Sequence, residues 1–328
     1  MNLRLPITAV ALLSLACSPA PKGAFDPWPK TGASLPPSNL FGDGFWKHWG
    51  DGDAELAGYD FSISRYREQR RGVAVAIFVT ETFSAAKKVK VDNADPSNPD
   101  QFPVLKLNLV EDFQTGVYDY NTMTSVFVAL KPVDGIADGT PSKAVYSSQE
   151  WCGQVFHQLA FGPAVIRETF HSYFEREGDH DGTLPARAEG VIEDSLPFWA
   201  RRLARPALNP GESRTVPLLR SLQHARLGHK RLAWTEATLR RETASRETAV
   251  PAGRFETEVW TAAIKDGPTR TFFVEKASPH RIVKWESSDG EKAELTGVKR
   301  LKYWELNSEK GEAALKNLGL SGRPRRTT

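Results

Sequence analysis

The clearest signal in the sequence is an alternation of apolar and polar residues that begins near residue 58. Residues 104–110, VLKLNLV, alternate leucine with lysine and asparagine, and residues 87–92, KKVKVD, alternate in a similar way. A period of two places successive side chains on opposite faces of a β-strand. Residues 73–83, VAVAIFVTETF, are apolar on both faces, which predicts a central strand of a sheet.

Turn-forming residues separate these segments at short intervals. Residues 93–103, NADPSNPDQFP, and residues 133–140, VDGIADGT, are rich in Asp, Asn, Gly and Pro. Toward the C-terminus, the turns Asp266-Gly and Asp289-Gly help to divide residues 254–306 into a four-stranded meander. Because such short connections leave no room for crossover helices, the strands should pair in antiparallel fashion.

Helical periodicity is confined to a few segments. Residues 191–204, VIEDSLPFWARRLA, place three apolar side chains on one face of a predicted helix. Residues 216–242 fit neither period clearly, and residues 310–320, KGEAALKNLGL, predict a short terminal helix. The whole pattern predicts a mainly β protein of about ten to twelve antiparallel strands, forming a large curved sheet or half-barrel with one or two helices packed on it.

The N-terminus has the features of an export signal. Arg4 precedes an uncharged run, residues 5–16, which is far shorter than the roughly 20 residues of a membrane-spanning helix. The run leads into LSLAC, residues 13–17, which resembles the lipobox of bacterial lipoproteins, where the cysteine is acylated, in part with palmitate, and becomes the new N-terminus. Cys17 is therefore the expected lipidation site. Ser18 resembles an outer-membrane rather than an inner-membrane sorting signal.

Composition divides the chain into four parts. Residues 1–16 are the predicted lipoprotein signal peptide, and residues 17–40 contain six prolines without hydrophobic periodicity, which predicts a tether. No comparable linker follows, so residues 41–310 are predicted to form a single β-rich domain, with a possible division into two halves near residue 190. Residues 311–328 are predicted to be a short helix and a basic tail.

Charge and motif content exclude several function classes. The 43 Lys and Arg residues oppose 40 Asp and Glu residues, and the most basic stretches, residues 200–206 and 321–328, are short. Nucleic-acid binding needs a dense basic face, so no nucleic-acid partner is expected. The chain contains no P-loop and no GxSxG sequence, and no cofactor is expected.

The second cysteine of the chain, Cys152, lies five residues before His157 in the segment SSQEWCGQVFHQ. If Cys17 is linked to lipid, Cys152 has no disulfide partner, and a lone thiol in an oxidising compartment survives best when buried. A spacing of five places Cys152 and His157 on opposite faces of a strand. We therefore expect a buried structural cysteine, with a redox-active or lipid-linked cysteine and a Cys/His nucleophile as alternatives.

Histidines and carboxylates gather in residues 171–181. His171 and Glu175 are expected to share a strand face, and residues 178–182, GDHDG, to form a turn. Because no HExxH or His-x-His spacing accompanies them, a polar strand face is preferred over a metal site, and no metal ligand is assigned. The candidates for a catalytic role are Glu150, Cys152, His171 and Glu175.

Two further features have a structural and a functional interpretation. The pair Glu193-Asp194 fits the N-terminus of the predicted helix, where negative charge is favourable, better than an acid/base couple. The nine tryptophans are expected to lie mostly in the core, but some could line an apolar cleft for an acyl chain, a peptide or a glycan.

The segments SSQEWCG (147–153), SYFEREGD (172–179) and VIEDSLPFWARR (191–202) resemble a family of exported bacterial lipoproteins of unknown function. Some members of that family carry the label "septum formation inhibitor Maf". True Maf proteins are cytosolic nucleotide pyrophosphatases with a Ser-x-Ser-Pro-Arg-Arg loop, which residues 321–328 do not reproduce. The final meander is loosely similar to the periplasmic lipoprotein carriers, in which a half-open barrel around a helix holds acyl chains. That likeness implies a fold and assigns no residue.

Taken together, these features predict a membrane-anchored lipoprotein of the bacterial envelope, at the outer rather than the inner membrane. Its curved sheet is expected to bind an apolar or amphipathic ligand, such as a lipid, or an envelope protein partner, without catalysis. The alternative is an envelope hydrolase or isomerase that uses residues 147–181. A purely structural envelope spacer is the third interpretation.

Overall fold

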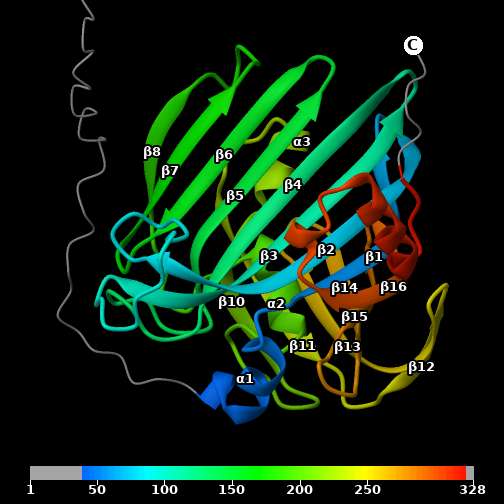
Figure 1. Ribbon diagram of the computed structural model, residues 1–328. Helices are drawn as coiled ribbons and strands as arrows, with labels where there is room; N and C mark the ends of the chain where they lie inside the picture. Colours follow the sequence, from blue (N-terminus) through cyan, green and yellow to red (C-terminus); the bar gives the residue numbers. More distant parts are fainter. Residues whose placement is uncertain (1–38, 323–328) are drawn as a thin grey trace, which may run out of the picture.

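The computed structural model describes residues 39–322, and its main feature is one strongly curved 16-stranded sheet (Figure 1). The strands are β1 (Ala54–Arg65), β2 (Glu68–Ser84), β3 (Gln101–Thr115), β4 (Tyr118–Ala129), β5 (Pro141–Glu150), β6 (Gly153–Phe161), β7 (Val165–Ser172), β8 (His180–Pro185), β9 (Val191–Ile192), β10 (Ser213–Leu219), β11 (Trp234–Arg241), β12 (Arg246–Val250), β13 (Gly253–Ile264), β14 (Thr269–Glu275), β15 (Ile282–Ser287) and β16 (Lys292–Leu301). The α-helices are α1 (Asp43–Trp49), α2 (Leu196–Ala200) and α3 (Leu222–Leu227), and the 3-10 helices are η1 (Asn39–Phe41), η2 (Glu193–Ser195), η3 (Tyr303–Glu305) and η4 (Glu309–Leu318).

The sheet is a meander, and strands that follow one another in sequence are mostly neighbours in space. The order runs from β8 back to β1, crosses to β16, and continues through β15, β14, β13, β11 and β10 to β9. All pairs are antiparallel except β9 with β10. The predicted mainly β, antiparallel, curved sheet is confirmed. The expected ten to twelve strands were too few, because residues 213–250 also form strands.

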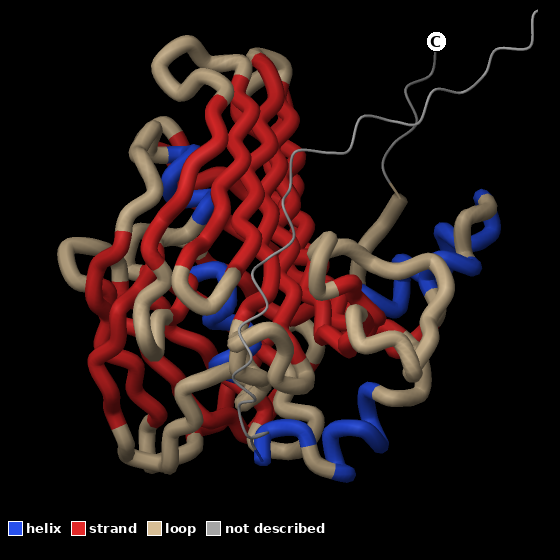
Figure 2. The backbone as a smooth tube through the Cα atoms, turned by 90° about the vertical axis from the view of Figure 1, so that its left-hand side faces the viewer, coloured by secondary structure: helices blue, strands red, loops and turns tan. Residues whose placement is uncertain are grey.

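Helices α2 and α3 lie on the inner face of the sheet, in the main hydrophobic core (Figures 1 and 2). Trp199 of α2 packs edge to face on Trp260 of β13, with ring centroids 5.1 Å apart, and both side chains are fully buried. Leu222 of α3 is also fully buried. The helices therefore fill the space that the curved sheet encloses, as the predicted packing requires.

The helix predicted over residues 191–204 is shorter than expected. Val191 and Ile192 form the parallel strand β9 against Leu218 and Leu219 of β10. After one 3-10 turn, α2 spans only five residues. Arg202 then adopts a positive φ of 63°, which is incompatible with a continuing right-handed helix. Strand pairing at one end and this backbone conformation at the other limit the helix.

The predicted terminal helix is present as the 3-10 helix η4, which packs on the outer side of β1 and β16. Its close approach needs two glycines that pair across these strands, Gly58 and Gly297. A β-carbon at either position would collide with the backbone of Asn317 or Leu318. No helix within residues 39–322 has the length and apolarity to cross a membrane. The predicted signal peptide, Cys17 and most of the tether lie outside the described residues.

Candidate functional site

The four predicted catalytic candidates do not converge on one site. Glu150, at the end of β5, is buried and lies 3.0 Å from Arg226 of α3, on the inner side of the sheet. His171 is exposed on the outer face of β7, 3.5 Å from Asp179. Glu175 does not share a strand face with His171, because β7 ends at Ser172 and Glu175 lies in the following turn. That prediction was wrong.

Cys152 is exposed, so the expectation of a buried structural cysteine was also wrong. Glu150 pairs with Gly153 across β5 and β6, and the two residues between them form the hairpin turn. Side chains at such a turn project into solvent, which the apolar neighbours in the sequence did not indicate. His157 is buried elsewhere on β6, with Nε2 2.7 Å from Oε1 of Glu168, and is not a partner of the thiol.

The structure does join the two motif segments 147–153 and 172–179, through Arg226. Its guanidinium contacts Glu150 at 3.0 Å and Glu177 at 3.4 Å, and stacks over the ring of Phe174. Glu177 also lies 2.8 Å from Nδ1 of His229. These contacts fix α3 to the ends of the strands, and Ser172 of β7 also donates a hydrogen bond to Glu177, at 2.6 Å.

Three tyrosine hydroxyls meet beside this ion-pair network. The hydroxyl of Tyr66 lies 2.8 Å from that of Tyr120 and accepts a hydrogen bond from Tyr118, while Arg65 donates to Tyr66 and Tyr120. Burial tends to raise the pKa of Tyr66, but the hydrogen bonds from Tyr118 and Tyr120 and the charge of Arg65 outweigh it and lower that pKa. The cluster ties the β1–β2 and β3–β4 hairpins together at one end of the sheet.

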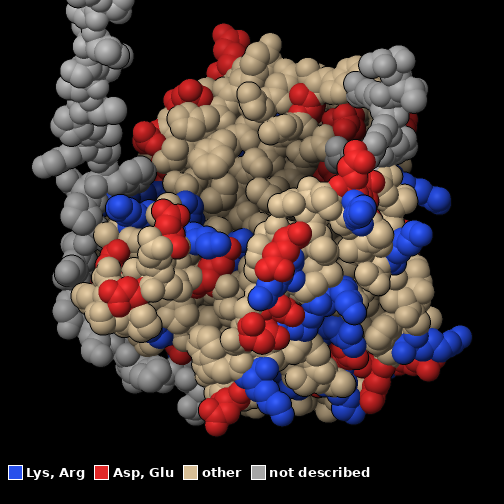
Figure 3. Space-filling view, viewed as in Figure 1, with Lys and Arg blue, Asp and Glu red and all other residues tan. Residues whose placement is uncertain are grey.

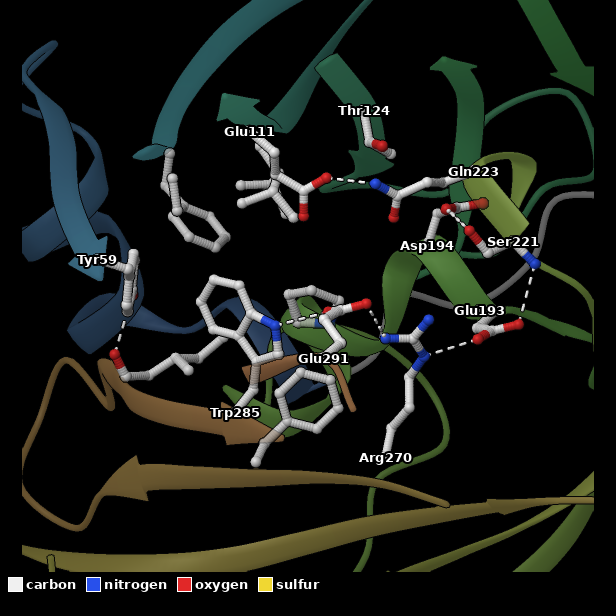
Figure 4. Close-up of a pocket in the computed structure, with 17 residues that line it drawn as sticks. Tyr59, Glu111, Thr124, Glu193, Asp194, Ser221, Gln223, Arg270, Trp285 and Glu291 are labelled. Atoms are coloured by element: carbon white, nitrogen blue, oxygen red, sulfur yellow. Dashed lines mark hydrogen bonds and ion pairs between the residues drawn. The ribbon is translucent and has the colours of Figure 1, made fainter. Parts of the chain in front are cut away.

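A second candidate is an enclosed cavity of about 60 Å³ between the inner face of the sheet and the helices (Figure 4). Its lining is mostly apolar, with rings from Tyr59, Phe78, Phe272 and Trp285. Binding pockets for drug-sized ligands are about 300–1,000 Å³. The cavity is therefore large enough for a few water molecules and too small for an acyl chain.

Glu111 of β3 is the polar group that stands out in this cavity. One of its carboxylate oxygens, Oε2, accepts hydrogen bonds from Gln223 of α3 and from Thr122, whereas Oε1 is buried without a partner. Burial, and then the charge of Glu291, raise the pKa of Glu111 to about 8. At pH 7 the neutral form of this side chain is therefore favoured.

The pair Glu193-Asp194 also borders the cavity, and its role differs from the predicted one. Glu193 bridges Arg220 at 2.8 Å and Arg270 at 2.6 Å, and Figure 4 shows the contact with Arg270. Burial raises the pKa of Glu193, but the two arginines outweigh it and lower that pKa to about 2. Asp194 accepts hydrogen bonds from Ser221 and the backbone of Leu222, so it caps α3 rather than its own helix.

A third candidate is a groove of about 950 Å³ on the outer face of the sheet. Its floor contains Val79, Lys106, Phe127 and Lys143, which follow one another across β2, β3, β4 and β5 in one row of the register. Its walls come from residues 89–94 on one side and from Trp46, Tyr303 and Trp304 on the other. This volume lies within the range of small-molecule binding sites.

Two lysines in the groove floor differ in their pairing. Nζ of Lys106 lies 2.6 Å from Oε1 of Glu81, which Lys90 also approaches at 3.8 Å. Lys143 is half-buried, and no hydrogen bond or ion pair joins it to any residue between 39 and 322. Burial lowers the pKa of the Lys143 amine. Within residues 39–322, one ammonium group at the base of this groove is thus without a counter-ion.

Between the groove and Asp112, which lies nearer the hairpin tips, two rows of the outer face carry no charged residue on strands β2–β6. The next row is Ile77, Asn108, Ser125 and Val145, and the row after it is Val75, Val110, Met123, Ser147 and Phe156. Met123 and Phe156 are 37% and 39% exposed, although this is the middle of a large sheet. Figure 3 shows this uncharged, hollowed surface, bordered by charged residues above and below.

The tryptophans divide between core and surface. Trp49, Trp199, Trp260 and Trp285 are buried, which confirms the core interpretation for these four. Trp46, Trp151 and Trp304 are exposed, and two of them flank the groove. Trp28 lies outside the described residues. The sequence analysis did not single out Lys143. The sequence shows lysines alternating with apolar residues, but the strand register decides that Lys143 lies in the same groove as Trp46 and Trp304.

Among residues 39–322, no three His, Cys, Asp or Glu side chains are arranged to hold a metal ion. No protein-family model matches the chain, and no curated protein matches it. Among solved structures, the chain is similar to a beta-barrel-like protein of a domain of unknown function, DUF1849, from Brucella abortus. The two share 11% sequence identity with a TM-score of 0.42, over 76% of this chain and 98% of the other. So distant a likeness assigns no activity.

Proposed function

We propose that the protein is a lipid-anchored protein of the bacterial envelope that binds an amphipathic ligand in the groove on the outer face of the sheet, without catalysis. The observation that carries this proposal is the pair of uncharged rows across β2–β6, with exposed Met123 and Phe156, which opens into the 950 Å³ groove. Antiparallel sheets usually present polar side chains on the face turned to water. An uncharged surface that exposes large apolar side chains there indicates an interaction surface.

Volume indicates which of the two sites, the cavity next to Glu111 or the outer groove, can hold such a ligand. The enclosed cavity next to Glu111 has about 60 Å³, whereas the groove has about 950 Å³. Of the two, only the groove has room for a ligand with an acyl chain or a fused ring system. Its walls of Trp46, Tyr303 and Trp304 provide rigid apolar contacts with polar edges, which suits a ligand that is itself amphipathic.

The test uses the chain from Ser18 onward and the neutral fluorescent probe N-phenyl-1-naphthylamine. The wild-type chain should bind the probe, and the double variant Met123→Glu, Phe156→Glu should bind it at least tenfold more weakly, because two carboxylates then border the apolar face. The matched control is Val117→Glu, since Val117 is 80% exposed at the β3–β4 turn, away from the groove.

Native mass spectrometry of the wild-type chain should also show a co-purifying ligand that the double variant lacks. Circular dichroism and thermal melts establish that the variants keep the fold. A wild-type chain without probe binding, or a double variant with unchanged affinity, would contradict the proposal.

A further inference from the structure

We infer that the groove selects an amphiphile whose alkyl chain ends in an anionic head group, a carboxylate or a phosphate, and that Lys143 pairs with this head group. The inference rests on the proposed function, because it concerns the same groove. It goes further by naming the chemical class of the ligand and the residue that recognises it.

Charge in the groove supports an anion. The lining contains Lys90, Lys106 and Lys143 against two carboxylates, Glu81 and Asp92, which leaves one net positive charge. Glu81 is already within 4 Å of Lys90 and Lys106. The half-buried ammonium of Lys143 has no counter-ion in the described part of the chain. An unpaired charge removed from water is unfavourable, and an anionic ligand would relieve that cost.

The register places the apolar face at a suitable distance from this ammonium. Rows of same-facing residues are about 7 Å apart along a strand, so the row of Met123 and Phe156 lies about 13 Å beyond the row of Lys143. An alkyl chain whose head group contacts Lys143 would therefore pass over Val145 and Ser125 and reach Met123. The charged end of the ligand would meet the charged row, and its chain would meet the uncharged rows.

Charge also argues against this chain's own C-terminal tail as the occupant. The residues after 322 include Arg323, Arg325 and Arg326, which would bring positive charge to a groove that already has an excess of it. A second copy of the chain would have to place an anionic segment against Lys143, and size-exclusion chromatography with light scattering detects such a dimer. A concentration-dependent dimer that Lys143→Met abolishes would overturn the inference.

The experiment compares four probes by isothermal titration calorimetry on the chain from Ser18: dodecanoate, dodecyl phosphate, dodecanol and inorganic phosphate. The two anionic amphiphiles should bind at least tenfold more tightly than dodecanol, which has the same chain and no charge. Inorganic phosphate should bind far more weakly than dodecyl phosphate. Tight binding of phosphate alone would indicate a simple anion site and would overturn the inference.

Three variants assign the effect to Lys143. Lys143→Met, which keeps an apolar stem, should lower dodecanoate affinity about tenfold and leave dodecanol affinity unchanged, whereas Lys143→Arg should retain the preference. The control is Lys265→Met, because Lys265 is 65% exposed in the β13–β14 turn. If Lys143→Met keeps the preference, the inference fails while the proposed function stands. If no amphiphile binds, both fail.

Discussion

Arg226 and Glu150 form a buried ion pair that joins helix α3 to the end of strand β5. Nη2 of the arginine lies 3.0 Å from Oε1 of the glutamate, and the two side chains are only 2% and 3% exposed. The pair thereby connects two residues 76 positions apart in sequence, on the inner face of the sheet where β5 ends. Glu177 contacts the same guanidinium, so one arginine holds both motif segments in place.

Removing this arginine should destabilise the fold strongly. Arg226→Met leaves Glu150 buried without its cationic partner, and loss of one member of a buried pair costs about 3–5 kcal/mol. The measurement is urea unfolding followed by tryptophan fluorescence. Arg254→Met, which breaks the exposed pair with Glu247, should leave the midpoint nearly unchanged. A midpoint for Arg226→Met equal to that of Arg254→Met would contradict this prediction.

Glu111 should make the protein less stable as pH rises. Its folded-state pKa is about 8 and its ordinary value is 4.5, so the folded state binds one more proton than the unfolded state between these values. Its contribution is complete below about pH 4.5 and declines as pH rises through 8, by up to about 1.4 kcal/mol per pH unit. Glu111→Gln keeps the shape of the side chain and removes its ionisation. The free energy of unfolding of this variant, from urea unfolding, should vary less between pH 5 and 8 than that of the wild type. An unchanged pH profile would count against the raised pKa of Glu111.

Glu193 should have the opposite effect at acid pH. Arg270 and Arg220 overcome the effect of burial and hold its pKa near 2, below the ordinary 4.5. The stability that it contributes is present above about pH 4.5 and is lost as pH falls toward 2. Glu193→Gln should be less stable than the wild type at pH 6 and differ less from it at pH 2. Urea unfolding at pH 6 and at pH 2 provides the comparison. If the variant and the wild type differ in stability by the same amount at both pH values, the lowered pKa of Glu193 is contradicted.

The thiol of Cys152 should react in the folded protein. It is exposed in the β5–β6 turn, so maleimide should add one label to the native chain from Ser18 without denaturant. Cys152→Ser should take up no label, and His157→Ala should be labelled at the same rate as the wild type, because His157 pairs with Glu168 instead. Labelling that needs denaturant would show that the turn is closed in solution.

Cys17 should decide where the protein resides. The full-length chain should appear in the membrane fraction of a bacterial host, and its mature N-terminus should carry acyl chains by intact-mass analysis. Cys17→Ser should move the protein to the soluble or uncleaved precursor fraction. The matched control, Cys152→Ser, should remain in the membrane fraction. An unacylated wild-type protein with its leader still attached would refute the predicted anchor.

Local periodicity predicted the mainly β content and its antiparallel pairing, but not the number of strands. Residues 213–250 form strands without a clear period, and residues 87–92 alternate without forming a strand. The leucines of residues 104–110 face the core, as alternation implies, and the final meander has the four strands expected. The helix over residues 191–204 was overestimated because β9 pairs with β10, a contact between residues 27 positions apart. Cys152 was predicted to be buried and is exposed, because the pairing of Glu150 with Gly153 places it in the turn of the hairpin. Where that turn lies depends on strand pairing and not on the local pattern.

The sequence by itself determined that the chain forms antiparallel β-structure, because the alternation of apolar and polar residues that favours a strand is set by residues that are neighbours in the sequence. It also contained the lipobox-like segment that predicts an anchor at Cys17. Only the tertiary structure decided the candidate sites. The row of Lys106, Phe127 and Lys143, and the hydrogen bond from Gln223 to Glu111, arise when register and curvature bring together side chains from distant parts of the chain. Those relationships are set by packing over the whole molecule, which no local pattern records.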